Sequence, residues 1–104
     1  MTNELNKIYL EILVLEAILG VIKSIKDNSF SIDEAERALF MPWVPEYLKK
    51  IELDSKIIDL IWQGIELEDV KDLCTEDDLT KEVEKLEKSI FTLLNKKIIK
   101  KENY

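Results

Sequence analysis

The stretch that decides the fold is ILVLEAILGVI, residues 12–22, in which Glu16 is the only charged residue. It lies inside a longer helical segment from about Asn3 to Asp27, whose apolar positions recur at steps of three and four: Leu5, Ile8, Ile12, Leu15, Leu19 and Ile22. That spacing is typical of one face of an α-helix. Beyond Ile12 the helix is apolar nearly all round, which indicates burial on several sides. We therefore expect this helix to be the central element of the fold or half of an oligomer interface.

The composition sets the class of fold around that helix. With 104 residues, of which 46% are hydrophobic and 36% charged, the chain can form one domain with one core. Two glycines and two prolines are too few for the many turns of an all-β fold. The sequence predicts an all-α protein, a single-domain irregular antiparallel bundle of four to six helices over residues 1–104.

Caps and breaks divide the rest of the chain into helices. Ser31 and Glu34 have the spacing of a capping box, which predicts a helix from Ile32. Further N-caps are expected at Asp54 and Thr75. Pro45 is expected as the first residue of a short helix, and Gly64 as a left-handed C-cap. The basic residues 96–104 are expected to form a frayed tail.

The same periodicity predicts which side chains form the core. We expect the following to be buried: Ile12, Leu15, Leu19, Ile22, Leu39, Ile58, Ile61, Leu86 and Ile90. Trp62 is expected to join them from the Ile58, Ile61 and Ile65 side of its helix. Cys74 is expected as a small buried hydrophobe, whereas Glu4, Lys7 and Glu11 are expected on the solvent side of the first helix.

Several classes of function are disfavoured by what the chain lacks. It contains no histidine, the usual general base and a common metal ligand, so we expect no enzyme. One cysteine cannot build a structural zinc site, and residues 66–78 lack the glycine and the alternating acids of a calcium loop. We therefore expect no metal and no cofactor. A net charge of −7 argues against direct binding of nucleic acid.

Location is inferred from the same observations. The opening residues lack the basic start of a signal peptide, and the apolar run at residues 12–22 is too short to span a membrane. A single cysteine suits a reducing compartment. We expect a cytoplasmic protein with no membrane contact.

The most conspicuous polar stretch is ELEDVKDLCTEDD, residues 66–78, with seven acids and one lysine. Four of the acids lie opposite the apolar positions of a short helix: Glu66, Glu68, Asp69 and Asp72. The other three occupy the first turn after Thr75, where the helix dipole favours anions: Glu76, Asp77 and Asp78. The place of each acid on its helix can therefore be explained if these residues form an ordinary solvated surface. It does not explain the asymmetry, because residues 52–87 carry thirteen acids against four lysines. Such a field can steer a basic partner.

An aromatic cluster interrupts the chain at LFMPWVPEYL, residues 39–48. One interpretation is that Phe40, Trp43 and Tyr47 cap one end of the bundle. The other is that Trp43 or Tyr47 is presented as an anchor for a partner, since these residue types are enriched at binding hot spots.

Three blocks of the chain resemble a small bacterial family catalogued as a domain of unknown function. They are the Leu-Gly pair at 19–20, the pattern IDEAE-x-x-LF-x-P at 32–42, and Gly64 followed by ELEDV at 66–70. The resemblance covers most of residues 15–95. It implies no activity and no site residues, but it suggests an immunity protein encoded beside a toxin.

Three functions remain open. The first is an immunity protein that binds a basic, nuclease-type toxin through Glu66, Glu68, Asp69, Asp72, Glu76, Asp77 and Asp78, with Trp43 or Tyr47 as apolar anchor. The second is a structural or adaptor subunit that self-associates, as a homodimer for example, through its apolar first helix. The third is a regulator that uses the basic tail on nucleic acid.

Overall fold

The computed structural model describes residues 3–104, and these residues form six α-helices and no strand. The helices are α1 (Glu4–Lys26), α2 (Ile32–Ala38), α3 (Trp43–Lys50), α4 (Ser55–Ile65), α5 (Leu67–Leu73) and α6 (Glu76–Glu102). The expected all-α single domain is confirmed. None of these helices combines the length and the apolarity needed to cross a membrane.

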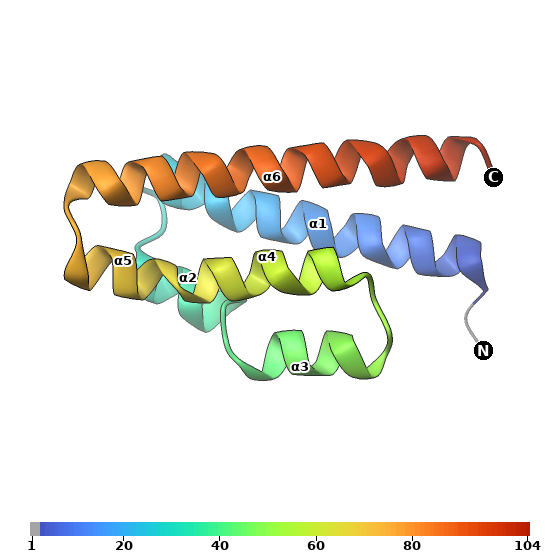
Figure 1. Ribbon diagram of the computed structural model, residues 1–104, viewed down its shortest axis with the longest axis horizontal. Helices are drawn as coiled ribbons and strands as arrows, with labels where there is room; N and C mark the ends of the chain where they lie inside the picture. Colours follow the sequence, from blue (N-terminus) through green and yellow to red (C-terminus); the bar gives the residue numbers. More distant parts are fainter. Residues whose placement is uncertain (1–2) are drawn as a thin grey trace.

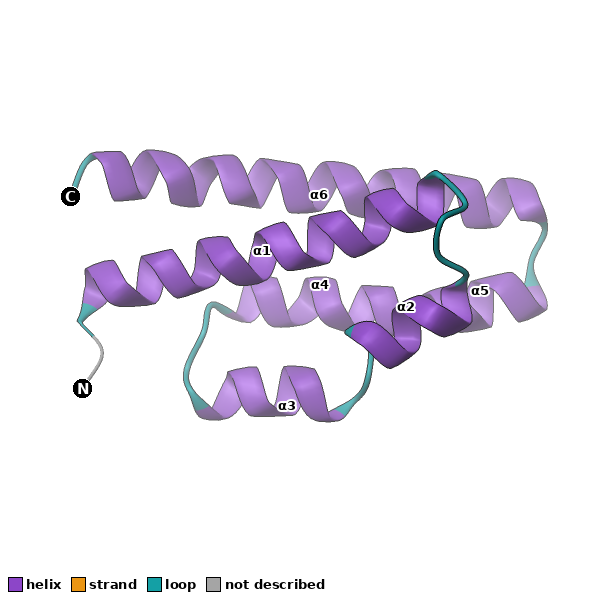
Figure 2. Cartoon of the chain, turned by 180° about the vertical axis from the view of Figure 1, so that it is seen from behind, coloured by secondary structure: helices purple, strands orange, loops and turns teal. Residues whose placement is uncertain are grey.

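Two long antiparallel helices, α1 and α6, form the spine of the molecule, and they make the most extensive contact in the bundle (Figure 1). α4 and α5 follow one another almost in line and run back along the spine. α3 packs against α4, and α2 lies between α1 and α5 (Figures 1 and 2). The molecule is elongated, with extents of 43 × 25 × 20 Å.

The expected N-caps are confirmed. The Ser31 hydroxyl accepts a hydrogen bond from the Glu34 amide at 3.1 Å, and the Glu34 carboxylate accepts one from the Ser31 amide at 3.2 Å. Thr75 makes the same reciprocal pair with Asp78 at the start of α6. Such caps satisfy amide donors that have no partner inside the helix.

The core is apolar and receives side chains from every helix. Six of the nine expected core residues are buried: Ile12, Leu15, Ile22, Ile61, Leu86 and Ile90. Leu19, Leu39 and Ile58 are only half-buried at its edge.

α4 is rotated about its axis relative to the prediction. It buries Ile57, Leu60, Ile61 and Gly64, and Trp62 is exposed. Apolar residues cover more than one side of α4, so the sequence spacing is compatible with burial of either of two helix faces. Packing against α3 and α6 determines which face is buried.

Cys74 is exposed, contrary to expectation. α5 ends at Leu73, and Cys74 has extended backbone angles as the C-cap. Because α5 has only two turns, it buries Leu67 alone, and Leu73 is 82% exposed.

Two expected helix ends also differ. α3 begins at Trp43, so Pro45 is its third residue rather than its first. The first turn of a helix has free amides, so proline is tolerated throughout it. Residues 96–104 are not a frayed tail, since α6 continues to Glu102. α1 holds the end of α6, with the Tyr104 hydroxyl donating to Glu4 at 3.3 Å and Lys101 lying over the Tyr9 ring.

Gly64 lies inside α4 rather than at a left-handed cap, and no glycine in the described chain has a positive φ. A Cβ at this position would overlap the ring of Phe40, which is itself buried. Gly64 therefore allows the aromatic ring to pack directly on the backbone of α4.

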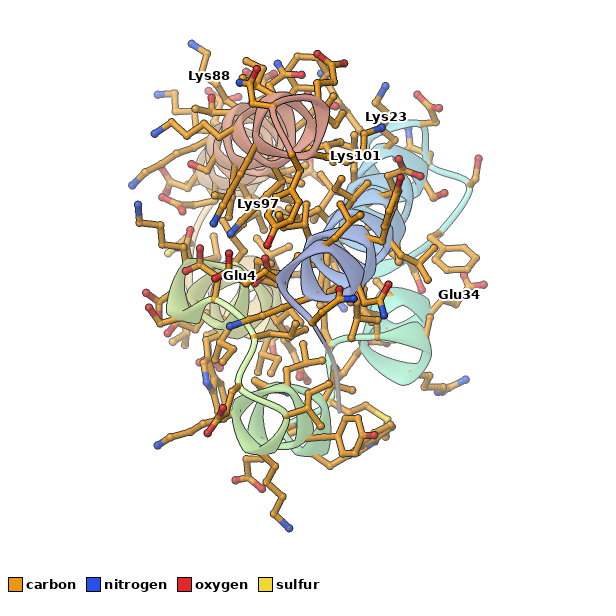
Figure 3. The ribbon with its side chains drawn as sticks, turned by 90° about the vertical axis from the view of Figure 1, so that its right-hand side faces the viewer. Glu4, Lys23, Glu34, Lys88, Lys97 and Lys101 are labelled. Carbon is orange, nitrogen blue, oxygen red and sulfur yellow. The ribbon has the colours of Figure 1, made fainter. Side chains whose placement is uncertain are left out.

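A buried ion network joins three helices. The Lys97 ammonium lies 3.1 Å from the Glu11 carboxylate and 2.8 Å from that of Asp54. In Figure 3, the Lys97 side chain extends from α6 toward the other helices of the bundle. The Asp54 amide donates to the second oxygen of Glu11 at 2.8 Å. Glu11 is only 2% exposed, so its expected place on the solvent side is wrong. The network ties α1 to α6 and to the start of α4.

Burial by itself would lower the pKa of Lys97, but its hydrogen bonds to Asp54 and Glu11, together with their charges, outweigh burial and raise the pKa. Burial by itself would raise the pKa of Asp54, and the hydrogen bonds from Lys97 and the Lys56 amide lower it. Both shifts favour the charged forms of Lys97 and Asp54, so the pair is stabilised as an ion pair in the folded protein.

We expect Gly64→Ala to destabilise the fold by about 1–3 kcal/mol, because the added methyl displaces the Phe40 ring in a packed core. Gly20→Ala is the matched control, since no atom lies within 4 Å of a Cβ at that position. It should raise the free energy of unfolding by up to about 1 kcal/mol through helix propensity. Urea denaturation measures both, and equal effects would contradict the packing role of Gly64.

We expect Lys97→Met to cost about 3–5 kcal/mol, because it leaves the Glu11 carboxylate buried without a cation. Lys96→Met removes the same charge from an exposed neighbour and should change stability by less than about 0.5 kcal/mol. Thermal and urea unfolding of the two variants test this. Similar stabilities would show that the network contributes nothing specific.

Candidate protein-binding surface

Seven acids of residues 66–78 gather at one end of the molecule, where α5 turns into α6 (Figure 1). Six of them are exposed, and Glu68 is half-buried. Thr75 determines where the chain turns between these two helices, because it is the N-cap of α6 and follows the end of α5 directly. The acids expected to form a partner surface thus come from two consecutive helices at one end.

α2 adds acids that the sequence interpretation did not include. Carboxylate oxygens of Asp33, Glu36 and Glu68 lie within 4.8 Å of one another. We call the carboxylates of α2 and of residues 66–78 the acidic end; it contains ten carboxylates against Arg37 and Lys71. The acidic spacing of α2 was visible in the sequence, but nothing there indicated that α2 would pack beside α5.

Glu68 is the most strongly perturbed acid of this surface. Its hydrogen bond to Glu36, followed by the charge of Glu36, raises its pKa above the ordinary value of 4.5. Two carboxylates this close share a proton more easily than they both ionise. Glu68 therefore faces α2 rather than open solvent, unlike its predicted place on the free side of the helix.

Other acids also have partners within the chain. Glu34 and Asp78 serve in the capping boxes, and Lys71 lies 3.6 Å from Asp33. Five exposed acids of the acidic end form neither an ion pair nor a capping hydrogen bond in the part of the chain that the structure describes: Glu66, Asp69, Asp72, Glu76 and Asp77. These five are the carboxylates available to a partner without breaking an internal contact.

The three clustered carboxylates of Asp33, Glu36 and Glu68 are accounted for without an ion. Calcium takes six to eight oxygen ligands, and this group offers three side chains at the surface. The Lys71 ammonium already faces Asp33, and Glu68 lies against Glu36.

The aromatic residues divide into a buried and an exposed group. Phe40 is buried against Gly64, but Trp43 is 61% and Tyr47 53% exposed, so these two do not cap the bundle. They are four residues apart on α3 and thus share one face of that helix. α3 packs on α4, so this aromatic pair is a surface on a different element from the acids.

A family model described as "Protein of unknown function (DUF3969)" matches residues 5–104. The chain belongs to this family. The match includes α2 to α6 and nearly all of α1, so the acidic end and the aromatic pair both lie within the DUF3969 domain. No curated protein and no solved structure matches the chain.

We expect Glu68→Gln to remove a pH-dependent contribution to stability. Because the folded-state pKa of Glu68 is raised, the wild type should gain stability relative to the variant as the pH falls through the range just above 4.5. It should lose that advantage again as the pH rises. Thermal unfolding from pH 4 to 7 measures the difference, with Glu36→Gln as the variant that removes the partner. A difference independent of pH would contradict the contact between the two acids.

Proposed function

We propose that this chain is an immunity protein, which binds a basic, nuclease-type toxin through its acidic end and neutralises it without catalysis. The observation that carries the proposal is the excess of ten carboxylates over two cations on neighbouring surfaces of α2, α5 and α6. An ordinary solvated surface mixes both signs of charge more evenly.

The proposed mechanism is occlusion. A nuclease cleft must be basic because it binds phosphates. Carboxylates held on helices can occupy the places of those phosphates. Asp69, Asp72 and Asp77 suit this role, since each is exposed and has no internal ion pair in the described residues. Complementary charge acts mainly on association rate and specificity, so binding should weaken as salt screens it.

Trp43 and Tyr47 supply the apolar part of the proposed interface. Exposed charges contribute little affinity by themselves, whereas a buried aromatic side chain can dominate it. Both rings project from a helix, so little conformational entropy is lost when a partner covers them.

Self-association through α1 is the second candidate function, that of a structural or adaptor subunit. One specific observation favours it: α1 is apolar nearly all round, yet Leu13 on its outer face is 63% exposed. This face is separate from the acidic end, so the two functions are compatible.

The test of the immunity proposal combines Asp69→Lys, Asp72→Lys and Asp77→Lys in one variant. Glu68 is left in place, because a lysine there would pair with Glu36. The probe is the product of the reading frame beside this gene, expressed with and without the chain. The wild type should restore growth and bind that product, and the variant should bind at least about tenfold more weakly, roughly 1.4 kcal/mol.

A matched control reverses Glu52, Asp59 and Glu102, which gives the same net charge but leaves the acidic end and the aromatic pair intact. It should bind like the wild type. Equal affinity of all three proteins would contradict a role for the acidic end, and a neighbouring product that is not toxic would contradict immunity itself.

A further inference from the structure

The outer face of α1 is apolar and uncovered. Leu10, Leu13, Ala17 and Gly20 are exposed and follow one another at steps of three and four, so they form one stripe. In the view from behind, α1 lies in front and no helix crosses it along most of its length (Figure 2). Between Ile8 and Lys23 the only charge on α1 outside the buried Glu11 is Glu16.

Gly20 has no function within the chain that its small size explains. Apart from the backbone of α1 itself, a Cβ there would have no atom of residues 3–104 within 4 Å, in contrast to Gly64. A glycine inside a helix costs about 1 kcal/mol relative to alanine. Its lack of a side chain does allow another backbone or a large side chain to approach α1 closely from outside.

The stripe is complementary to itself. Its two large residues come first and its two small residues second, at mirrored spacing about residue 15. If a second α1 runs antiparallel across it, Leu10 of each copy meets Gly20 of the other, and Leu13 meets Ala17. A two-fold interface needs such a pattern, because the same surface contributes to both sides.

The charges favour the antiparallel arrangement as well. The acidic end lies where α1 finishes, whereas α1 begins beside the last turns of α6 (Figure 1). Those last turns of α6 contain Lys96, Lys100 and Lys101. The last turn of α1 also contains two lysines, Lys23 and Lys26, but the ten carboxylates of the acidic end outnumber them. Antiparallel copies bring the acidic end of each toward the basic end of the other. Parallel copies would bring like charges together, which costs free energy.

We propose that the stripe of Leu10, Leu13, Ala17 and Gly20 binds a second copy of this chain in an antiparallel two-fold dimer. The inference rests on the second candidate function and gives it a surface and an orientation. Much of the acidic end remains open in such a dimer, because α5 and the start of α6 lie away from the outer face of α1 (Figure 2).

Sedimentation equilibrium of the full chain at micromolar concentration tests the surface. We expect a dimer for the wild type, and Leu13→Lys should weaken it at least about tenfold, because the lysine would be buried against an apolar face. Leu73→Lys is the control, since Leu73 is even more exposed but lies on α5; it should not change the dimer. Circular dichroism checks that both variants are folded.

Single cysteines test the orientation in a Cys74→Ser background. Glu16→Cys lies close to the proposed two-fold axis and should give a covalent dimer with a short bismaleimide. Asn6→Cys is exposed on the same side of α1, but antiparallel copies separate the two thiols by roughly 27 Å along the helices, so it should not cross-link.

Each outcome decides a different point. A wild-type monomer at all concentrations would overturn both the dimer and the second candidate function. A dimer unaffected by Leu13→Lys would leave self-association standing but overturn this face. Cross-linking through Asn6→Cys would overturn the antiparallel orientation.

Discussion

The bundle depends on one buried ammonium group. Lys97 reaches Glu11 and Asp54 at the same time, and Asp54 is also the N-cap of α4. A buried ion network contributes little net stability compared with apolar packing, but a register that leaves one member unpaired is strongly disfavoured. The network therefore selects the alignment of α6 along α1 and the point where α4 begins.

The two ends of the bundle differ in how their charges are used. Near the chain ends, the charges are used internally, in the Lys97 network and in the contacts of Lys101 and Tyr104 with α1. At the opposite end, α2 and α5 bring together acids that few cations neutralise. Unpaired carboxylates on a helical scaffold lose no internal contact when a basic partner binds. This is why the acidic end is the stronger candidate for function.

The two glycines lie in similar sequence contexts but have different structural roles. Both lie inside apolar helices, and neither has a positive φ. Gly64 is required by Phe40, which packs on the backbone beneath it, whereas Gly20 faces open space. The outer stripe of α1 is thus an apolar surface whose composition the monomer does not explain.

The helical class, three capped helix starts and five buried positions on α1 and α6 could be predicted from the sequence alone; these positions are Ile12, Leu15, Ile22, Leu86 and Ile90. Caps and helical periodicity are local properties, readable within a few residues, and they survive in any packing arrangement. Other features depend on the tertiary structure. They are the face of α4 that is buried, the burial of Glu11 and Lys97, the exposure of Trp43, Tyr47 and Cys74, and the position of α2 beside the acids of α5. Each of them depends on which helix lies beside which, and a charged residue on a helix gives no local sign of whether water or an oppositely charged group will face it.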